Sequence, residues 1–136
     1  MSFQATDPCL CGRADARGRP LPFARCCGLY LSDFDRRPAP DAHALMRSRY
    51  CAFVLQDGPY LLATWHASQR PGSLDFEPGV KWLGLEVRAH EVLDADHAVV
   101  EFVARSRHGG RAQRLHERSR FLRGDGRWFY FDGDML

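Results

Sequence analysis

Residues 41–66 carry apolar side chains at helical spacing. From Asp41 onward they return every three or four positions, which places them on one face of a helix. Asp41 can cap the start of this helix, and the segment 56–58, Gln-Asp-Gly, ends it. Pro59 suits the first turn of a second, shorter helix over 59–66. The pattern predicts a helical hairpin in which Cys51 packs within the first helix.

Beyond residue 72 the apolar positions alternate, as they do in half-buried strands. The first strand begins near Val80, with Leu83, Leu85 and Val87 on one face. Three more strands are predicted over 97–107, 112–123 and 127–132, with turns between them. The glycine pair at 109–110 supplies the positive φ that a tight hairpin needs. The order of elements predicts an antiparallel meander packed behind two helices, which is an α+β fold.

The hairpin centred on this glycine pair has one apolar face that also contains a carboxylate. Pairing the strands puts Glu117 on that face, and burial of a carboxylate favours general acid or base chemistry. The weak catalytic candidates are therefore Glu117, Asp132 on the next strand, and His66 at the end of the second helix. The favoured alternative is a satisfied polar network, in which Glu117 bonds to Arg49, Trp65 or a tyrosine hydroxyl. The face comprises Val100, Phe102, Ala104, Leu115, Glu117, Ser119 and Phe121.

The opposite face of the same hairpin is rich in arginine. Such a face could receive phosphates, and Glu101 opposite Arg118 would offset only part of its charge. It has no interleaved aromatic platform, so a solvated surface is the favoured interpretation. The arginines are Arg105, Arg107, Arg114, Arg118 and Arg120.

The first 38 residues contain too few large apolar side chains to form a core. We therefore divide the chain into a small module over 1–38, which needs a metal to fold, and a domain over 39–136. The module holds two tight cysteine pairs, Cys9 with Cys11 and Cys26 with Cys27. Four thiolates complete the tetrahedral shell of one zinc ion and leave no open position for water. Adjacent cysteines can share an ion only where the chain turns or starts a helix, and Gly28 permits such a bend.

Composition narrows the possible functions. Net charge is only +2, and Lys81 is the single lysine, with no apolar run around it to suit lysine-nucleophile chemistry. No basic start followed by an apolar stretch is present, and no run approaches the roughly 18 apolar residues of a membrane span. We expect a cytoplasmic protein with no membrane partner. Because the cytosol is reducing, metal binding is favoured over the disulfide alternative.

The N-terminal residues resemble a known zinc motif. Pro8-Cys9-Leu10-Cys11-Gly12, followed by Cys26-Cys27-Gly28, is similar to the SEC-C motif of the bacterial preprotein translocase ATPase. The resemblance implies Cys9, Cys11, Cys26 and Cys27 as ligands of a structural zinc, although a thiolate site also accepts iron. The Gly-Ser-Gly-Lys segment of the motif is replaced by a longer spacer over 13–20. The arginines between the two cysteine pairs suit an acidic or phosphate-bearing partner, but a solvated loop is the favoured alternative. They are Arg13, Arg17, Arg19 and Arg25.

Four further strings, over 44–50, 60–66, 100–105 and 117–121, closely resemble the bacterial YchJ family. That family joins a SEC-C motif to a domain like nuclear transport factor 2. The resemblance implies a cystatin-like cone, in which a curved antiparallel sheet packs on helices, and it implies no assigned activity.

Three functional hypotheses follow. The leading one is a zinc-binding adaptor whose module contacts a protein or ribonucleoprotein partner. The alternative is a small-molecule-binding protein, or an isomerase or dehydratase, that uses a pocket in the cone. A thiol-redox protein is the third, and it would need an exposed thiol of low pKa. No catalytic signature matches the cysteine pairs in strength, so an enzyme is the less favoured class.

Overall fold

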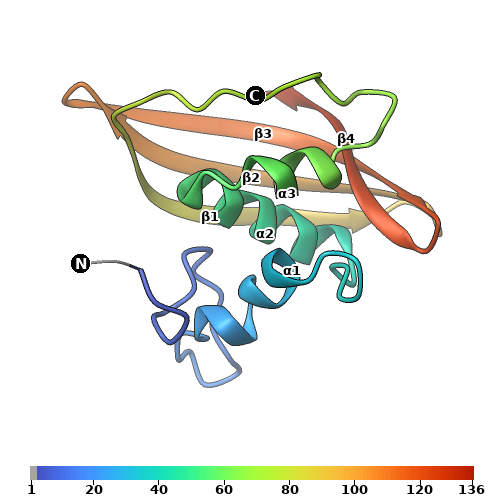
Figure 1. Cartoon of the computed structure of the whole chain (residues 1–136), viewed down its shortest axis with the longest axis horizontal. Helices are drawn as coiled ribbons and strands as arrows, with labels where there is room; N and C mark the ends of the chain where they lie inside the picture. The colour runs from blue at the N-terminus through green and yellow to red at the C-terminus, as the bar shows by residue number, and fades with distance from the viewer. Residues whose placement is uncertain (1–2) are drawn as a thin grey trace.

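The computed structural model describes residues 3–136 and has an α+β fold (Figure 1). A 3₁₀ helix η1, Phe23–Arg25, and helix α1, Gly28–Ser32, precede the long helix α2, Ala42–Leu55, and the short helix α3, Gly58–Ala63. The strands are β1, Val80–Val92; β2, His97–His108; β3, Arg111–Gly124; and β4, Arg127–Met135. They form one antiparallel sheet in sequential order, as the alternating pattern predicts.

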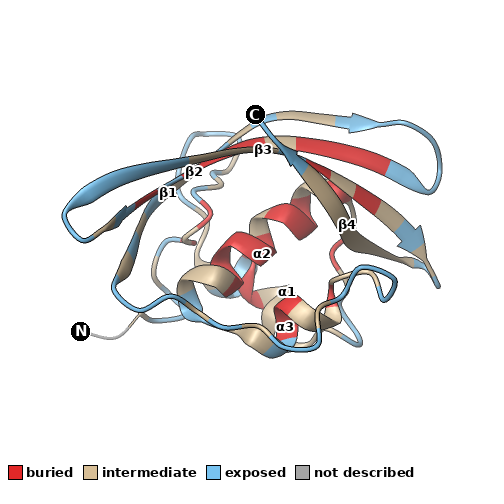
Figure 2. Ribbon diagram, turned by 90° about the horizontal axis from the view of Figure 1, so that it is seen from above, coloured by how far each residue is buried: buried red, intermediate tan, exposed pale blue. Residues whose placement is uncertain are grey.

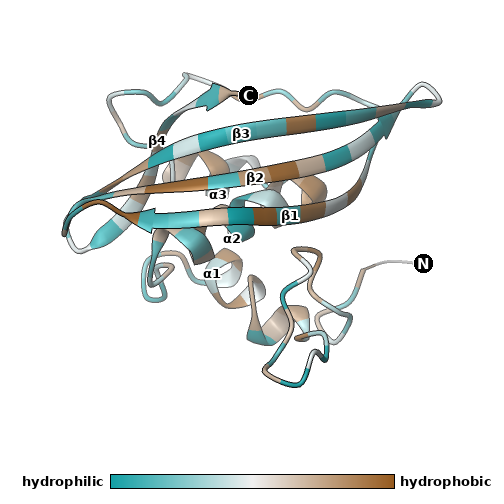
Figure 3. Cartoon of the chain, turned by 180° about the vertical axis from the view of Figure 1, so that it is seen from behind, coloured by the Kyte–Doolittle hydropathy of each residue, from teal (hydrophilic) through white to brown (hydrophobic). Residues whose placement is uncertain are grey.

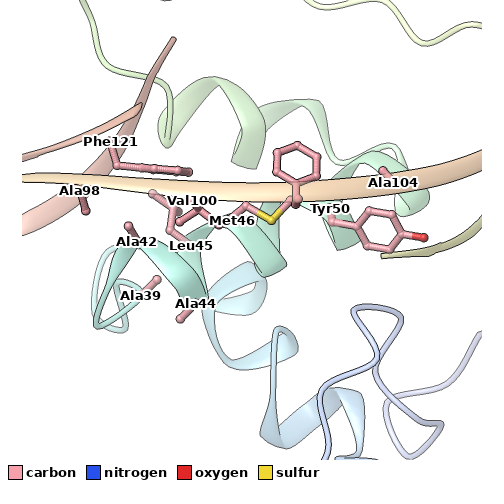
Figure 4. Packing of buried hydrophobic residues seen from close by; sticks show 11 residues of the cluster. Ala39, Ala42, Ala44, Leu45, Met46, Tyr50, Ala98, Val100, Ala104 and Phe121 are labelled. Atoms are coloured by element: carbon pink, nitrogen blue, oxygen red, sulfur yellow. The ribbon is translucent and has the colours of Figure 1, made fainter. Parts of the chain in front are cut away.

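The sheet curves around helix α2, and the buried surfaces of the two face each other (Figure 2). Leu45 and Met46 of α2 pack on Val100 of β2 and Phe121 of β3 in the principal core (Figure 4). The view from behind shows the opposite, convex side of the sheet, with hydrophilic stretches along β1 and β3 (Figure 3). The concave side of the sheet is therefore the place where a cavity can form.

Helix α2 has the predicted bounds because its caps are encoded locally. Asp41 accepts a hydrogen bond from the Ala44 N–H at 2.7 Å, and Gln56 ends the helix in the left-handed conformation with φ 57°. Asp57 caps α3 in the same way, through the Tyr60 N–H at 3.1 Å. The predicted start of each helix is thereby confirmed.

Helix α3 ends three residues earlier than predicted. The Thr64 hydroxyl donates to the Tyr60 carbonyl at 2.8 Å, and Trp65 then leaves the helix to form a parallel bridge with Tyr130 of β4. The His66 N–H continues this contact by donating to the Tyr130 carbonyl at 2.7 Å. Pairing with a strand 65 positions further along the chain cannot be inferred from local helical spacing, so the predicted end at residue 66 is wrong.

Strand β1 contains a bulge that corrects another prediction. The register shifts between Trp82 and Gly84, so one extra residue stands on the β1 side of the ladder. As a result Leu83 is 49% exposed, while Trp82, Leu85 and Val87 pack against the core. Leu83 therefore does not share a face with Leu85 and Val87.

The N-terminal segment lies below α2 and α1 in the view of Figure 1, and Leu85 of β1 also packs against its cysteine cluster. One anchor is Arg47 of α2, whose Nη1 donates to the Cys11 carbonyl at 2.8 Å. No helix within residues 3–136 is long and apolar enough to cross a bilayer.

Candidate metal centre and cone cavity

The four cysteines of the N-terminal segment are brought together by two turns. The Cys9 N–H donates to the Leu21 carbonyl at 2.8 Å, which pairs the residues around Cys9 with the segment that leads into η1. Gly12 turns the chain between them with φ 78°. Cys26 ends η1 and Cys27 caps α1, so the adjacent cysteines lie at a helix start as expected. Gly28 is needed for space, because a Cβ there would lie 2.7 Å from the Phe23 carbonyl oxygen.

The sulfur geometry fits one tetrahedral ion. The Sγ atoms of Cys9, Cys11, Cys26 and Cys27 all lie within 4.8 Å of one another, and all four residues are buried. The Sγ atoms of Cys11 and Cys26 are 3.7 Å apart. Sulfurs that surround an ion tetrahedrally at about 2.3 Å are separated by about 3.8 Å, so the cluster has the right size. All five cysteines are free thiols, which contradicts the disulfide alternative.

The thiols share their protons unequally. Hydrogen bonds donated by neighbouring thiols, first that of Cys26, hold the pKa of Cys11 far below its ordinary value. The pKa of Cys27 is raised, because its thiol donates to Cys11 first and to the other sulfurs next. A cation bound at the centre of the cluster would lower the pKa of all four thiols, since cysteine binds a metal as the thiolate.

Cys51 also lies beside the metal centre, a position that the sequence did not predict. It lies on α2, is fully buried, and packs against the cysteine cluster, with its Sγ 3.7 Å from that of Cys9. Its position within the helix was expected, but nothing in the helical pattern indicated contact with a segment 40 residues earlier. Together with Arg47 it makes α2 part of the wall around the metal centre.

A second candidate site is a cavity of about 320 Å³ between α2 and the concave side of the sheet. Its lining includes Phe53, Trp82 and Leu115, which also line a larger and more open cavity of about 620 Å³. The segment that joins α3 to β1 contributes Phe76 to the outer cavity. The shared residues show that the smaller, inner cavity and the outer cavity are adjacent.

Arg49 places a positive charge in the wall of the inner cavity. The residue is 6% exposed, and its Nη1 donates to the Leu61 carbonyl at 2.8 Å and to Thr64 Oγ1 at 2.6 Å. Its Cζ lies over the rings of Trp65 and Tyr130, at 5.2 and 4.7 Å from their centroids. Burial lowers the pKa of Arg49 to about 10, which leaves the side chain charged at neutral pH.

Glu117 lies on the concave face, as the sequence predicts, and lines the same cavity. Its Oε2 accepts hydrogen bonds from Ser119 Oγ and, at 3.4 Å, from the Tyr130 hydroxyl. This confirms the tyrosine partner of the predicted polar network, whereas Arg49 and Trp65 make no hydrogen bond to Glu117 within residues 3–136. Gly133 of β4 makes room for the carboxylate, because a Cβ there would lie 2.6 Å from Oε2.

The other two candidate acid and base residues lie elsewhere. The register of β3 and β4 shifts between Arg120 and Phe121, and Asp132 consequently accepts a hydrogen bond from Arg120 Nε at 2.5 Å. His66 follows α3, bonds to Ser68 Oγ and packs on Phe129 and Phe131. Neither residue is among those that line the inner cavity, so the structure does not bring Asp132 or His66 together with Glu117 there.

Three of the five arginines of the convex face pair with acids, whereas Arg107 and Arg114 form no salt bridge within the described residues. Arg105 lies 3.5 Å from Glu86, and Arg118 lies 3.8 Å from Glu91. Arg120 also reaches Asp134 at 2.7 Å. Glu101 lies opposite Arg118 in the strand register, as predicted, but its carboxylate bonds to His116 at 2.8 Å. These contacts fit a solvated surface better than a phosphate-binding one.

Known proteins resemble both the N-terminal cysteine segment and the domain that follows it. Residues 41–133 match the family model described as "YchJ, middle NTF2-like domain". A UPF0225 protein of Polaromonas naphthalenivorans is 67% identical, over 96% of this chain and 99% of that protein. One from Bordetella pertussis is 51% identical, over 87% and 90%.

Two solved structures share the fold. The solution structure of a SEC-C motif containing protein from Rhodopseudomonas palustris has a TM-score of 0.78 and 32% identity, over 96% of this chain and 99% of that one. The crystal structure of a SEC-C motif containing protein from Psychrobacter arcticus has a TM-score of 0.79 and 31% identity, over 94% and 82%.

Proposed function

This chain belongs to the YchJ family of UPF0225 proteins, and on that premise we propose that it binds a small molecule in its NTF2-like domain. The observation that carries the proposal is the inner cavity of about 320 Å³, whose wall holds Arg49 and Glu117. Small-molecule sites are mostly apolar cavities of roughly 300–1,000 Å³ with a few placed polar groups. The inner cavity has this size and this composition.

In this proposal the cysteine cluster holds a structural zinc. Four thiolates satisfy Zn²⁺ completely, so the ion would have no open position for a water or a substrate, and its contribution would be to fold the N-terminal segment. Iron is the other ion that such a site accepts. The five free thiols suit a reducing cytoplasm, which is where we place the protein.

Binding is favoured over catalysis because the cavity brings together few proton-transfer groups. Glu117 is its single carboxylate, and no histidine stands among the described residues that line it. Isomerase or dehydratase chemistry by an acid and a base would have to use a tyrosine such as Tyr130 as the second group, and the Tyr130 hydroxyl already donates to Glu117.

The proposal is tested by closing the cavity. Ala104 lines it and is 3% exposed, so Ala104→Phe places a ring in the space that a ligand would use. Small molecules released by denaturing the wild-type protein, purified from bacterial cells, should be absent from the variant when mass spectrometry compares the two extracts. Val92→Phe, at an exposed site, is the matched control. The same extract from wild type and Ala104→Phe, or no small molecule from either, would contradict the proposal.

An adaptor role is the second candidate, and the exposed loop of the cysteine segment favours it. Arg17 of this loop and Arg25 at the end of η1 are exposed, and neither forms a salt bridge within the described residues. An exposed basic loop suits an acidic protein or a ribonucleoprotein. If it binds ribosomes, Arg17→Glu should reduce co-sedimentation with them, whereas Arg111→Glu, in the exposed β2–β3 hairpin, should not. Equal co-sedimentation of both variants would remove this candidate.

A further inference from the structure

Arg49 has hydrogen-bonding capacity that the protein leaves unused. A guanidinium carries five N–H groups, and only Nη1 makes hydrogen bonds within residues 3–136. The Nε and Nη2 donors have no partner there, and no acidic side chain lies within salt-bridge distance. The indole N–H of Trp65, which also lines the cavity, is buried and unpartnered in the same part of the chain. Arg49 lines the cavity, so its free N–H groups are suited to an acceptor group from a ligand.

Glu117 is a hydrogen-bond acceptor in the wall of the same cavity, and Tyr130 links it to Arg49. The ring of Tyr130 lies 4.7 Å from Arg49 Cζ, and its hydroxyl donates to Glu117 Oε2 at 3.4 Å. Tyr130 therefore contacts both the cation and the carboxylate. Both hydrogen bonds to Glu117 reach Oε2, and within residues 3–136 Oε1 has no partner. One oxygen thus remains available to a donor group.

The charges of the cavity decide between ligand classes. Arg49 and Glu117 are its cation and its carboxylate, so a simple monoanion on Arg49 would also face the negative charge of Glu117. A molecule that carries a donor group next to its carboxylate satisfies both residues at once. Its carboxylate pairs with Arg49, and its donor group pairs with Glu117. The charge pattern therefore favours a ligand whose polar end carries both kinds of group.

The remainder of the inner cavity is apolar and aromatic. Met46 and Phe53 of α2 face Phe102 of β2 and Phe121 of β3, with Trp82 of β1 beside them. Such walls accept an aromatic ring or a branched aliphatic group and offer it no hydrogen bond. The ligand body must therefore be apolar.

We propose that the cavity binds an α-amino or α-hydroxy acid with an apolar side chain. Its carboxylate would accept hydrogen bonds from the free N–H groups of Arg49, and its amino or hydroxyl group would donate to Glu117. This inference rests on the proposed function and adds the chemical class of the ligand.

Five compounds of similar shape test the class: L-phenylalanine, phenyllactate, hydrocinnamate, phenethylamine and benzene. The chain has three tryptophans, of which Trp65 and Trp82 line the cavity and Trp128 does not, so their indole N–H signals in ¹H–¹⁵N spectra report binding with an internal control. Phenylalanine or phenyllactate should shift the Trp65 and Trp82 signals and bind about tenfold or more tightly than hydrocinnamate or phenethylamine. The better of the two binders distinguishes an amino from a hydroxy acid.

Two conservative variants check the residue assignments. Glu117→Gln should abolish the preference for phenylalanine or phenyllactate over hydrocinnamate, whereas Glu101→Gln on the convex face should keep it. Arg49→Lys retains the positive charge but loses the guanidinium donors. It should weaken the binding of every carboxylate more than the binding of benzene.

The outcomes separate the two proposals. If benzene shifts Trp65 and Trp82 but the two acids bind no better than hydrocinnamate, the ligand class is wrong and a small-molecule cavity still stands. If none of the five compounds shifts either signal, both the ligand class and the proposed function are overturned.

Discussion

The cysteine cluster and the cone cavity both bury polar side chains, but they arrange them differently. In the cluster, four sulfurs converge within 4.8 Å of one another and leave room for a single ion. In the cavity, which has a volume of about 320 Å³, Arg49 and Glu117 lie in the wall. A convergent set of buried ligands is completed by a metal, whereas polar groups spread around an apolar volume are completed by an organic molecule. On this difference rests our proposal that the first region has a structural role and the second binds a ligand.

The largest expected effect comes from removing metal ligands. In the double variant Cys9→Ser with Cys26→Ser, we expect complete loss of bound metal and loss of amide protection over residues 3–33. Metal binding contributes on the order of 10 kcal/mol to the folding of such modules. Elemental analysis and hydrogen exchange measure the two effects.

Cys51→Ala is the matched control for the double variant. Cys51 touches Cys9 but is outside the group of four, so this variant should keep one metal per chain. Equal metal loss in Cys51→Ala would show that the four sulfurs are wrongly assigned.

The next effect tests the cavity. Arg49→Met should lower the free energy of unfolding by about 2 kcal/mol, because the Leu61 carbonyl and the Thr64 hydroxyl lose their buried charged donor. Urea denaturation gives this value, and Arg105→Met on the exposed face is the control. Metal content should be unchanged in both. A loss of metal in Arg49→Met would mean that the two regions are not separable.

Gly133→Ala should have a smaller effect that is specific to Glu117. The backbone of Gly133 has no positive φ, but the new Cβ would approach Oε2 to 2.6 Å, which we expect to cost about 1 kcal/mol. The cost should disappear in the Glu117→Ala background, as a double-mutant cycle by urea denaturation would measure. An unchanged cost would mean that Gly133 serves something other than the carboxylate.

The smallest effect concerns the convex face. Arg118 is exposed and lies 3.8 Å from Glu91, so Arg118→Gln should change the free energy of unfolding by less than about 0.5 kcal/mol. Thermal unfolding checks this. A loss comparable to that of Arg49→Met would remove the contrast between the paired surface arginines and the buried one.

Local sequence signals predicted the parts of the molecule that are locally determined. The Asp41 cap and the apolar spacing defined α2, and the two cysteine pairs identified the cluster before its geometry was known. The position of Glu117 also followed, because the pairing across Gly109 and Gly110 has no irregularity.

The errors arose where distant segments determine the structure. A bulge reverses the face of each residue beyond it, and this moved Leu83 outward and separated Asp132 from Glu117. His66 and Cys51 contact segments far from them in the sequence, β4 and the cysteine cluster. Alternation and helical spacing contain no information about such pairings.

The most direct test of this division between the two regions is native mass spectrometry with L-phenylalanine and phenyllactate. The wild-type protein should carry one zinc ion and one acid molecule per chain. Arg49→Met should keep the zinc and lose the acid, and the Cys9→Ser, Cys26→Ser double variant should lose the zinc. A wild-type protein without metal, or an acid adduct of equal strength in Arg49→Met, would contradict the account.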